Sequence, residues 1–397
     1  MSASTLKAAA RFGDIRIPAR IAISGALAIA MASFAVFFMQ IALSEDYITP
    51  AKAPMGGDYA AFWTAAKAVA AGEAAQIYDP AHFREWLFEI APPKETWGLT
   101  WQYPPTYFFA IALLALLPYG FGYAVWTGGG LALFTAAARG AGVKAEALVL
   151  LLAAPTLFQA VITGQNGFLT ASLLLGATML ADKRPAAAGL CAALLTMKPQ
   201  LGLLLPFAYI AGGHWRAFGV AAAGSIVLAG ASLAVFGTGP WLAFFESILG
   251  AGANVESGRM PLFKMPTAYA AFSLAGFPPV FALALHAVGA AAAVWTTVTI
   301  WRRSDNAALK AAVVACGAFL LAPYAYYYEL VIMAVPLALL AMQSAREGWR
   351  PYEQLILAPL FLIPLVLPGD PIKAGFNLSF VVTVLAFVFV LRRFKAA

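Results

Sequence analysis

The chain has 397 residues, of which 62% are hydrophobic and 11% are charged, whereas a soluble domain has about 25% charged residues. This composition excludes a soluble globular protein and indicates a polytopic membrane protein. The formal net charge of +7 fits basic cytoplasmic loops against anionic lipid. Because the basic residues are dispersed between apolar segments, the charge does not indicate nucleic acid binding.

The first apolar run covers residues 21–43 and follows a segment that carries several basic residues. The run is too long for the core of a signal peptide, so we predict a retained first span with the N-terminus in the cytoplasm. Residues 44–104 come next, with eight acidic and four basic residues. This balance predicts a large first extracytoplasmic loop.

The rest of the chain is predicted to continue as one integral membrane domain over residues 1–397, all α-helical, with about 12 spans (11–13). Segment 106–117 is shorter than the roughly 20 residues that a span needs, so we predict that it is re-entrant or interfacial. Basic turns between later spans are assigned to the cytoplasm, and residues 237–277 are predicted to form a second extracytoplasmic loop. The later spans are predicted at 121–138, 147–163, 167–181, 185–197, 200–212, 217–236, 278–301, 307–323, 330–343, 353–367 and 375–391.

The first loop carries a candidate catalytic carboxylate, Asp58. It follows Gly56 and Gly57, which let the backbone turn sharply, and it precedes a stretch with apolar residues at helical spacing. One interpretation is a helix N-cap, since a carboxylate is favoured at a helix start. The other is a base whose carboxylate points at the membrane surface.

A second candidate is Lys198, which lies between two short apolar runs and precedes Pro199. An ionisable group at membrane depth indicates function unless its side chain snorkels to the surface. The functional interpretation is a cation that binds a lipid-borne phosphate. Glu329 follows three tyrosines and either begins a helix within an aromatic belt or belongs to a sugar site. The predicted topology places these polar residues on one outer face: Asp58, Gln165, Asn166, Lys198, Arg259, Lys264, Tyr328 and Glu329.

Several short motifs occur in a fixed order along the chain. They are Gly56-Gly57-Asp58-Tyr59 with Phe62-Trp63, Ile77-Tyr78-Asp79-Pro80, Tyr103-Pro104-Pro105, Gly164-Gln165-Asn166-Gly167, Lys198-Pro199-Gln200 and Pro323-Tyr324. Over roughly residues 50–340 this ordered set resembles the polyprenol-phosphate-mannose-dependent α-mannosyltransferase family, glycosyltransferase family 87, long filed as a domain of unknown function. The resemblance implies the GT-C fold, with many spans and a catalytic aspartate in a large first outer loop.

The resemblance also implies roles for individual residues. Asp58 would be the general base that deprotonates the acceptor hydroxyl. Many relatives have a His or Asp near the start of the span after Pro323, where this chain has Tyr328 and Glu329. Lys198 would help hold the donor phosphate, and Gln165 and Asn166 would line the sugar site. Beyond the resemblance, we predict Arg259 and Lys264 as further cations for the donor phosphate. The residues that we predict to contact the sugar or the acceptor are Tyr59, Trp63, Tyr103, Gln165, Asn166, Tyr328 and Glu329.

The expected function is therefore that of an inverting membrane glycosyltransferase. It would move mannose from a polyprenyl-phosphate donor to a glycolipid or glycan hydroxyl on the extracytoplasmic side of the inner membrane. No cofactor and no metal-binding residue is assigned, because the histidines, His82, His214 and His286, are scattered and the cysteines, Cys191 and Cys316, lack metal spacing. The alternative is a lipid or sugar transporter without covalent chemistry, although transporters often show internal repeats and none is apparent here.

Overall fold

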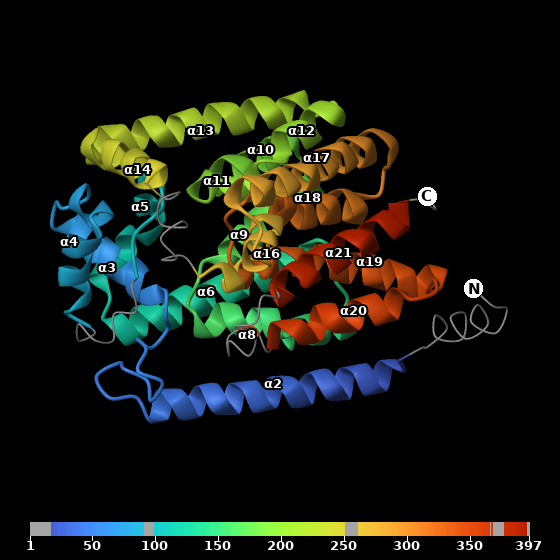
Figure 1. Ribbon diagram of the computed structural model, residues 1–397, viewed down its shortest axis with the longest axis horizontal. Helices are drawn as coiled ribbons and strands as arrows, with labels where there is room; N and C mark the ends of the chain where they lie inside the picture. Colours follow the sequence, from blue (N-terminus) through green and yellow to red (C-terminus); the bar gives the residue numbers. More distant parts are fainter. Residues whose placement is uncertain (1–16, 91–98, 251–260, 366, 368–376, 395–397) are drawn as a thin grey trace.

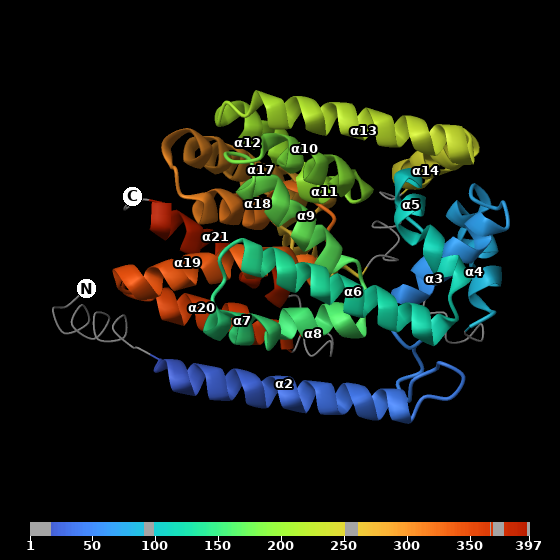
Figure 2. The same ribbon diagram turned by 180° about the vertical axis from the view of Figure 1, so that it is seen from behind.

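The computed structural model describes residues 17–90, 99–250, 261–365, 367 and 377–394. Every regular element in this part of the chain is a helix, and the only β-type pairs are isolated bridges near residue 48. The all-α prediction is therefore confirmed for the described residues. Figures 1 and 2 show an elongated bundle, in which α2 (Ala19–Ala42) and α13 (Trp215–Phe236) run along opposite long sides.

Four helical segments are long and apolar enough to cross a membrane: Arg20–Ala42, Trp215–Phe236, Pro279–Arg303 and Tyr327–Glu347. A fifth crossing is possible at α7 (Ala145–Leu152) and α8 (Pro155–Ile162), which are bent by 51° with respect to each other. The protein is thus a multi-pass membrane protein. The larger number of about 12 spans stays a prediction, because the other apolar helices are shorter.

The predicted spans nevertheless coincide with helices, and several of them are divided. Segment 147–163 divides at Pro155, whose ring disfavours a helical conformation in the residue before it. Segment 330–343 begins as the 3₁₀ helix η7 (Tyr327–Met333) before α19 (Ala334–Glu347). The remaining helices in the span regions are α6 (Tyr119–Gly140), α9 (Gly167–Met179), α10 (Pro185–Leu194), η5 (Leu195–Met197), α11 (Pro199–Gly202), α12 (Leu205–Ala211), α17 (Pro279–Arg303), α18 (Ala307–Leu321), α20 (Glu353–Leu362), η8 (Ile363–Leu365) and α21 (Leu378–Phe394).

The predicted first loop is itself largely helical. It contains α3 (Tyr59–Ala70), η1 (Gln76–Tyr78) and α4 (Pro80–Leu87). The predicted re-entrant segment is a succession of short turns, η3 (Pro105–Tyr107), α5 (Phe108–Ile111) and η4 (Ala112–Leu116), rather than one continuous helix. The predicted second loop holds α14 (Gly239–Leu249), η6 (Leu262–Lys264) and α16 (Ala268–Leu274).

The centre of the bundle is α18, in which every residue from Leu309 to Leu320 is buried. A helix surrounded on all sides is apolar on every face, which explains this stretch apart from Lys310, whose ammonium pairs with Asp182 at 3.4 Å. Small residues allow close helix packing elsewhere: a Cβ at Gly189 of α10 would lie 2.5 Å from the Ala217 carbonyl oxygen of α13. The long helices α2 and α13 are mostly exposed and present their apolar side chains outward.

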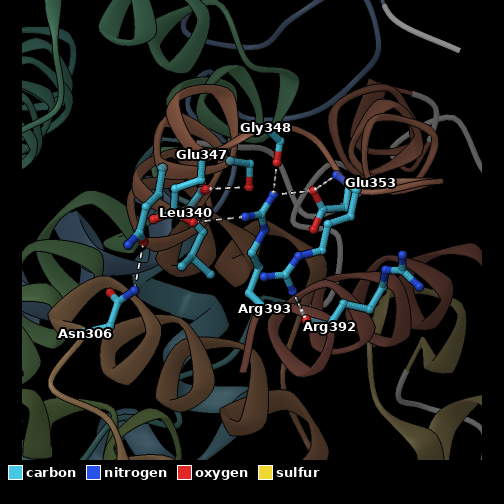
Figure 3. A network of polar contacts seen from close by, with 10 residues as sticks. Asn306, Leu340, Glu347, Gly348, Glu353, Arg392 and Arg393 are labelled. Atoms are coloured by element: carbon cyan, nitrogen blue, oxygen red, sulfur yellow. Dashed lines mark hydrogen bonds and ion pairs between the residues drawn. The ribbon is translucent and has the colours of Figure 1, made fainter. Parts of the chain in front are cut away.

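The two ends of the bundle differ. Figures 1 and 2 place α3, α4, α5 and α14 at one end. The start of α2, the α17–α18 and α19–α20 connections and the end of α21 lie at the opposite end. At this second end the buried Arg393 of α21 contacts Glu347 of α19 at 3.4 Å and also pairs with the buried Glu353 of α20 (Figure 3). This network joins the last three helices.

Candidate active site

Four segments that are far apart in the sequence bring polar side chains together. Asp58 directly precedes α3, and Gln165 lies in the turn between α8 and α9. Lys198 lies between η5 and α11, and Glu329 lies in η7. All four residues belong to the set predicted from the sequence, and the contacts described below connect them in one continuous group.

The Asp58 side chain does not cap the helix that follows it. Its backbone is helical, with φ of −68° and ψ of −15°, and its carboxylate makes no capping hydrogen bond. Asp79, in the same loop, shows the contrast, because it caps α4 and accepts a hydrogen bond from the Ala81 amide at 2.9 Å. The capping interpretation of Asp58 is therefore wrong, and its carboxylate has a different partner.

That partner is Gln165. Its side-chain amide donates to Asp58 Oδ2 at 2.6 Å, and its carbonyl oxygen accepts from the Tyr103 hydroxyl at 3.3 Å. The same carbonyl oxygen accepts from Lys198 Nζ at 3.4 Å. One side chain thus contacts both the candidate base and the candidate phosphate-binding cation.

Lys198 also forms an ion pair with Glu329, with Nζ 2.7 Å from Oε1. Both side chains are almost completely buried, with 4% and 2% of their surface exposed. The ammonium lies 5.4 Å from the centre of the Tyr103 ring and 5.6 Å from that of Tyr328, distances at which cation–π attraction operates. Lys198 therefore does not snorkel to the surface, and Glu329 provides its counter-charge.

Gly164 allows the α8–α9 turn to approach the loop around Asp58. Its φ is +56°, a left-handed conformation that glycine adopts without strain. A Cβ at this position would lie 2.5 Å from Tyr59 Cβ and 2.7 Å from the Gly56 carbonyl oxygen. Only glycine therefore fits between the two segments, and this close approach lets Gln165 reach Asp58.

Aromatic rings surround the polar group. Tyr103 stacks on Tyr107 with ring centres 4.5 Å apart, and Tyr326 stacks on Tyr328 at 5.4 Å. The Asn166 amide donates to the Tyr107 hydroxyl at 2.9 Å. Tyr107 and Tyr326 are not among the site residues predicted from the sequence. The signals that point to them are their spacings, four residues after Tyr103 and two before Tyr328.

Two other residues predicted to bind sugar, Tyr59 and Trp63, lie outside the polar group around Gln165. Tyr59 packs against Tyr119 and Tyr123, and the Trp63 indole donates to the Leu117 carbonyl at 2.9 Å. Neither ring takes part in the hydrogen bonds around Gln165, so a role for them in sugar binding stays a prediction. Lys264 ends η6 near enough to act on the charge of Asp58, whereas Arg259 lies outside the described residues.

The surrounding protein sets the charge behaviour of the Asp58 carboxyl. Although the side chain is only half-buried, loss of hydration raises its pKa above the usual range. The hydrogen bond from Gln165 and the charges of Lys264 and Lys198 act in the opposite direction and lower the pKa. A carboxylate with a raised pKa is a stronger base, which is what proton abstraction from a hydroxyl needs.

Fold and site together define an all-helical membrane protein with a carboxylate and an ammonium held on one amide. The comparison with protein families is consistent with this class: residues 101–323, more than half of the chain, match the sequence model of glycosyltransferase family 87. The chain belongs to this family and is a glycosyltransferase. No curated protein and no solved structure shows a significant match to it. The matched region includes Tyr103, Gln165, Asn166, Lys198 and Lys264, whereas Asp58 and Glu329 lie outside it.

Proposed function

We propose that the protein transfers mannose from a polyprenyl-phosphate donor to a hydroxyl of a glycolipid or glycan, with Asp58 as general base. The observation that carries this proposal is the Gln165 amide, which holds the Asp58 carboxylate at 2.6 Å and the Lys198 ammonium at 3.4 Å. A base and a cation held together match the two charges that sugar transfer from a phosphate must manage. Family membership favours this chemistry over transport alone.

The proposed step is an in-line displacement at the anomeric carbon. The acceptor hydroxyl gives its proton to Asp58 while its oxygen attacks the anomeric carbon of the donor sugar. The bond between that carbon and the phosphate oxygen breaks, and its electron pair stays on the phosphate, which leaves as polyprenyl phosphate. Lys198 stabilises the added negative charge, and attack from the face opposite the phosphate inverts the configuration.

An apolar cavity supports a lipid-linked donor. It has a volume of about 200 Å³ and lies between the η3–α5 segment, the α10–η5 segment and α13. One of its lining residues is Met197, which directly precedes Lys198. A phosphate bound at Lys198 would therefore have apolar surface beside it for the first prenyl units. The cavity is lined by Thr106, Phe109, Ala110, Leu194, Thr196, Met197 and Leu228.

The proposed membrane side is the extracytoplasmic one. The helices of the acidic first loop lie at the end of the bundle opposite to the α17–α18 and α19–α20 connections. Arg302 and Arg303 end α17 just before the first of these connections, and Arg350 lies in the second. Basic residues beside such turns favour the cytoplasm. This arrangement supports an active site that opens toward the outside of the inner membrane.

A reconstituted transfer assay tests the proposal. The purified protein in liposomes is given radiolabelled polyprenyl-phosphate mannose, polyprenyl-phosphate glucose or a nucleotide-linked mannose, each with a membrane lipid extract as acceptor. We expect label in a new glycolipid or glycan only from polyprenyl-phosphate mannose, and its formation should be about 10²-fold or more slower with the Asp58→Asn variant. Transfer from the nucleotide donor alone, or translocation of intact donor without transfer, would overturn the proposal.

A further inference from the structure

The side-chain oxygen of Gln165 accepts hydrogen bonds from protein groups. Three donors face Oε1: the Tyr103 hydroxyl at 3.3 Å, Lys198 Nζ at 3.4 Å and the Asn166 backbone amide at 3.3 Å. A flipped amide would direct its NH₂ group at an ammonium and its oxygen at a carboxylate. The chemistry of the partners therefore fixes the orientation, with Nε2 donating to Asp58.

We propose that Gln165 is a positioning residue that orients the Asp58 base and couples it to Lys198, rather than a group that binds sugar. The coupling to Lys198 rests on the proposed function, in which Lys198 binds the phosphate of the sugar donor. Gln165 is 5% exposed, so its surface is largely inaccessible to a sugar. Since Oδ2 of Asp58 is held by the amide, Oδ1 is the oxygen that receives the proton of the acceptor.

Through Gln165, the basicity of Asp58 depends on whether the sugar donor is bound. A charged group that hydrogen-bonds the oxygen of an amide polarises the amide and strengthens the hydrogen bond from its NH₂ group. The Lys198 ammonium therefore strengthens the hydrogen bond that Gln165 donates to Asp58. When a phosphate draws the ammonium toward itself, this reinforcement weakens and the carboxylate becomes more basic. The Asp58 carboxylate would thus be the strongest base when the sugar donor is bound.

Other groups around Asp58 set the background for this effect. The positive charges that act on the carboxylate are Lys198 and Lys264, and the nearby Tyr328 hydroxyl also lowers the pKa of Asp58. The negative charge of Glu329 lies on the far side of Lys198, paired with it at 2.7 Å. The tyrosines that sense the charge of Asp58 are Tyr103, Tyr326, Tyr327 and Tyr328.

The test compares Gln165→Met with Gln159→Met. Methionine keeps the length of glutamine but removes both the donor and the acceptor. Gln159 is a matched control, because it is a buried glutamine of α8 whose amide, among the residues that the structure describes, donates to the Pro364 carbonyl alone, at 3.5 Å. We expect kcat of Gln165→Met to fall about 10- to 100-fold, the scale of a misplaced catalytic group, with a smaller change in KM for the donor.

The pH profile separates positioning from a structural role. Asp58 acts in its deprotonated form, and the Gln165 amide stabilises that form. Its removal raises the pKa of Asp58, so the acidic limb of the kcat profile should move to higher pH in Gln165→Met and stay in place in Gln159→Met. If Gln165→Met does not fold, Gln165→Glu is used, because it is nearly isosteric and should shift the limb further through its added charge.

Infrared titration gives a readout that does not depend on turnover. The carboxyl stretch of Asp58 is identified as the band missing from Asp58→Asn, and its midpoint should lie at higher pH in the Gln165 variant. An unmoved band and an unmoved limb would overturn the inference. A moved band in a protein that never uses polyprenyl-phosphate mannose would contradict the proposed donor and leave the positioning role supported.

Discussion

Asp58 and Asp79 occupy the same loop, yet only Asp58 has a carboxylate directed at a buried amide. We expect Asp58→Asn to lower turnover by about 10²-fold or more, the usual scale for a positioned base, while folding and donor binding stay close to normal. Asp58→Glu should restore only part of the rate, because the added methylene displaces the carboxylate. Steady-state transfer rates and donor-binding isotherms measure both effects.

The matched control is Asp79→Asn. Asparagine caps helices about as well as aspartate, and Asp79 contacts the Ala81 amide of α4 rather than the site. This variant should keep wild-type turnover. A stably expressed Asp58→Asn enzyme with near wild-type turnover would remove Asp58 from the mechanism and direct attention to Glu329.

The Lys198–Glu329 pair changes how the lysine must be tested. Lys198→Ala alone would leave the buried Glu329 carboxylate without its counter-charge, although it still accepts from the Tyr326 backbone amide at 3.4 Å. Breaking a buried pair costs about 3–5 kcal/mol of stability. The informative comparison is therefore Lys198→Met with Glu329→Gln against Glu329→Gln alone, in which the glutamine carbonyl can still accept a hydrogen bond from the Lys198 ammonium. We expect the double variant to bind polyprenyl-phosphate mannose at least about tenfold more weakly than the single variant, measured by binding in detergent. Equal donor affinity would show that Lys198 does not hold the phosphate.

A functional residue could be predicted from the sequence only where its immediate neighbours in the chain make a charged side chain unusual. Lys198 stands between apolar runs, and Asp58 follows two glycines, so both were selected. The contacts of Gln165 could not be predicted, because its partners come from segments about residues 58, 103 and 198. The pairing of Glu329 with Lys198 was hidden for the same reason, since the two residues are far apart in the chain.

At the scale of elements, apolar runs predicted where the helices lie, but not where they divide. The turn between α8 and α9 exists because Gly164 adopts a left-handed conformation that its neighbours would deny to any other residue. The sequence shows this glycine, but the clash that makes it necessary depends on the backbone of Gly56 and the side chain of Tyr59. Such contacts are set by the packed helices and not by local propensity.

Gly164→Ala tests this turn. Alanine in a left-handed conformation costs about 1–2 kcal/mol, and here a Cβ would also meet Tyr59 Cβ at 2.5 Å. Gly213 is the control, because its φ is +72° but nothing lies within 4 Å of a Cβ there. We expect Gly164→Ala to lower the thermal midpoint in detergent clearly more than Gly213→Ala, together with a loss of transfer activity. Equal midpoints would show that the turn can move apart without loss.

For the whole molecule, the sequence predicted a membrane protein with an acidic outer loop and basic inner turns. In the bundle, the helices of the acidic loop and the turns beside basic residues lie at opposite ends. The number of spans was harder to predict, because several helices are shorter than a bilayer requires and pack inside the bundle, where length no longer reports crossing. The membrane side of each end is likewise a prediction from charge alone. Both can be tested with single cysteines placed at opposite ends.

The final prediction concerns Ala81 in α4 and Asp305 in the α17–α18 connection, which are both exposed. In a background with Cys191→Ala and Cys316→Ala, Ala81→Cys should react with an impermeant maleimide in cells whose outer membrane has been permeabilised. Asp305→Cys should react only after lysis, because its connection follows Arg302 and Arg303 and basic turns remain in the cytoplasm. The opposite pattern would place the Asp58 carboxylate in the cytoplasm, where nucleotide-linked sugars could supply the donor. Labelling of both cysteines in unlysed cells would instead show that the chain crosses the membrane an unexpected number of times between them.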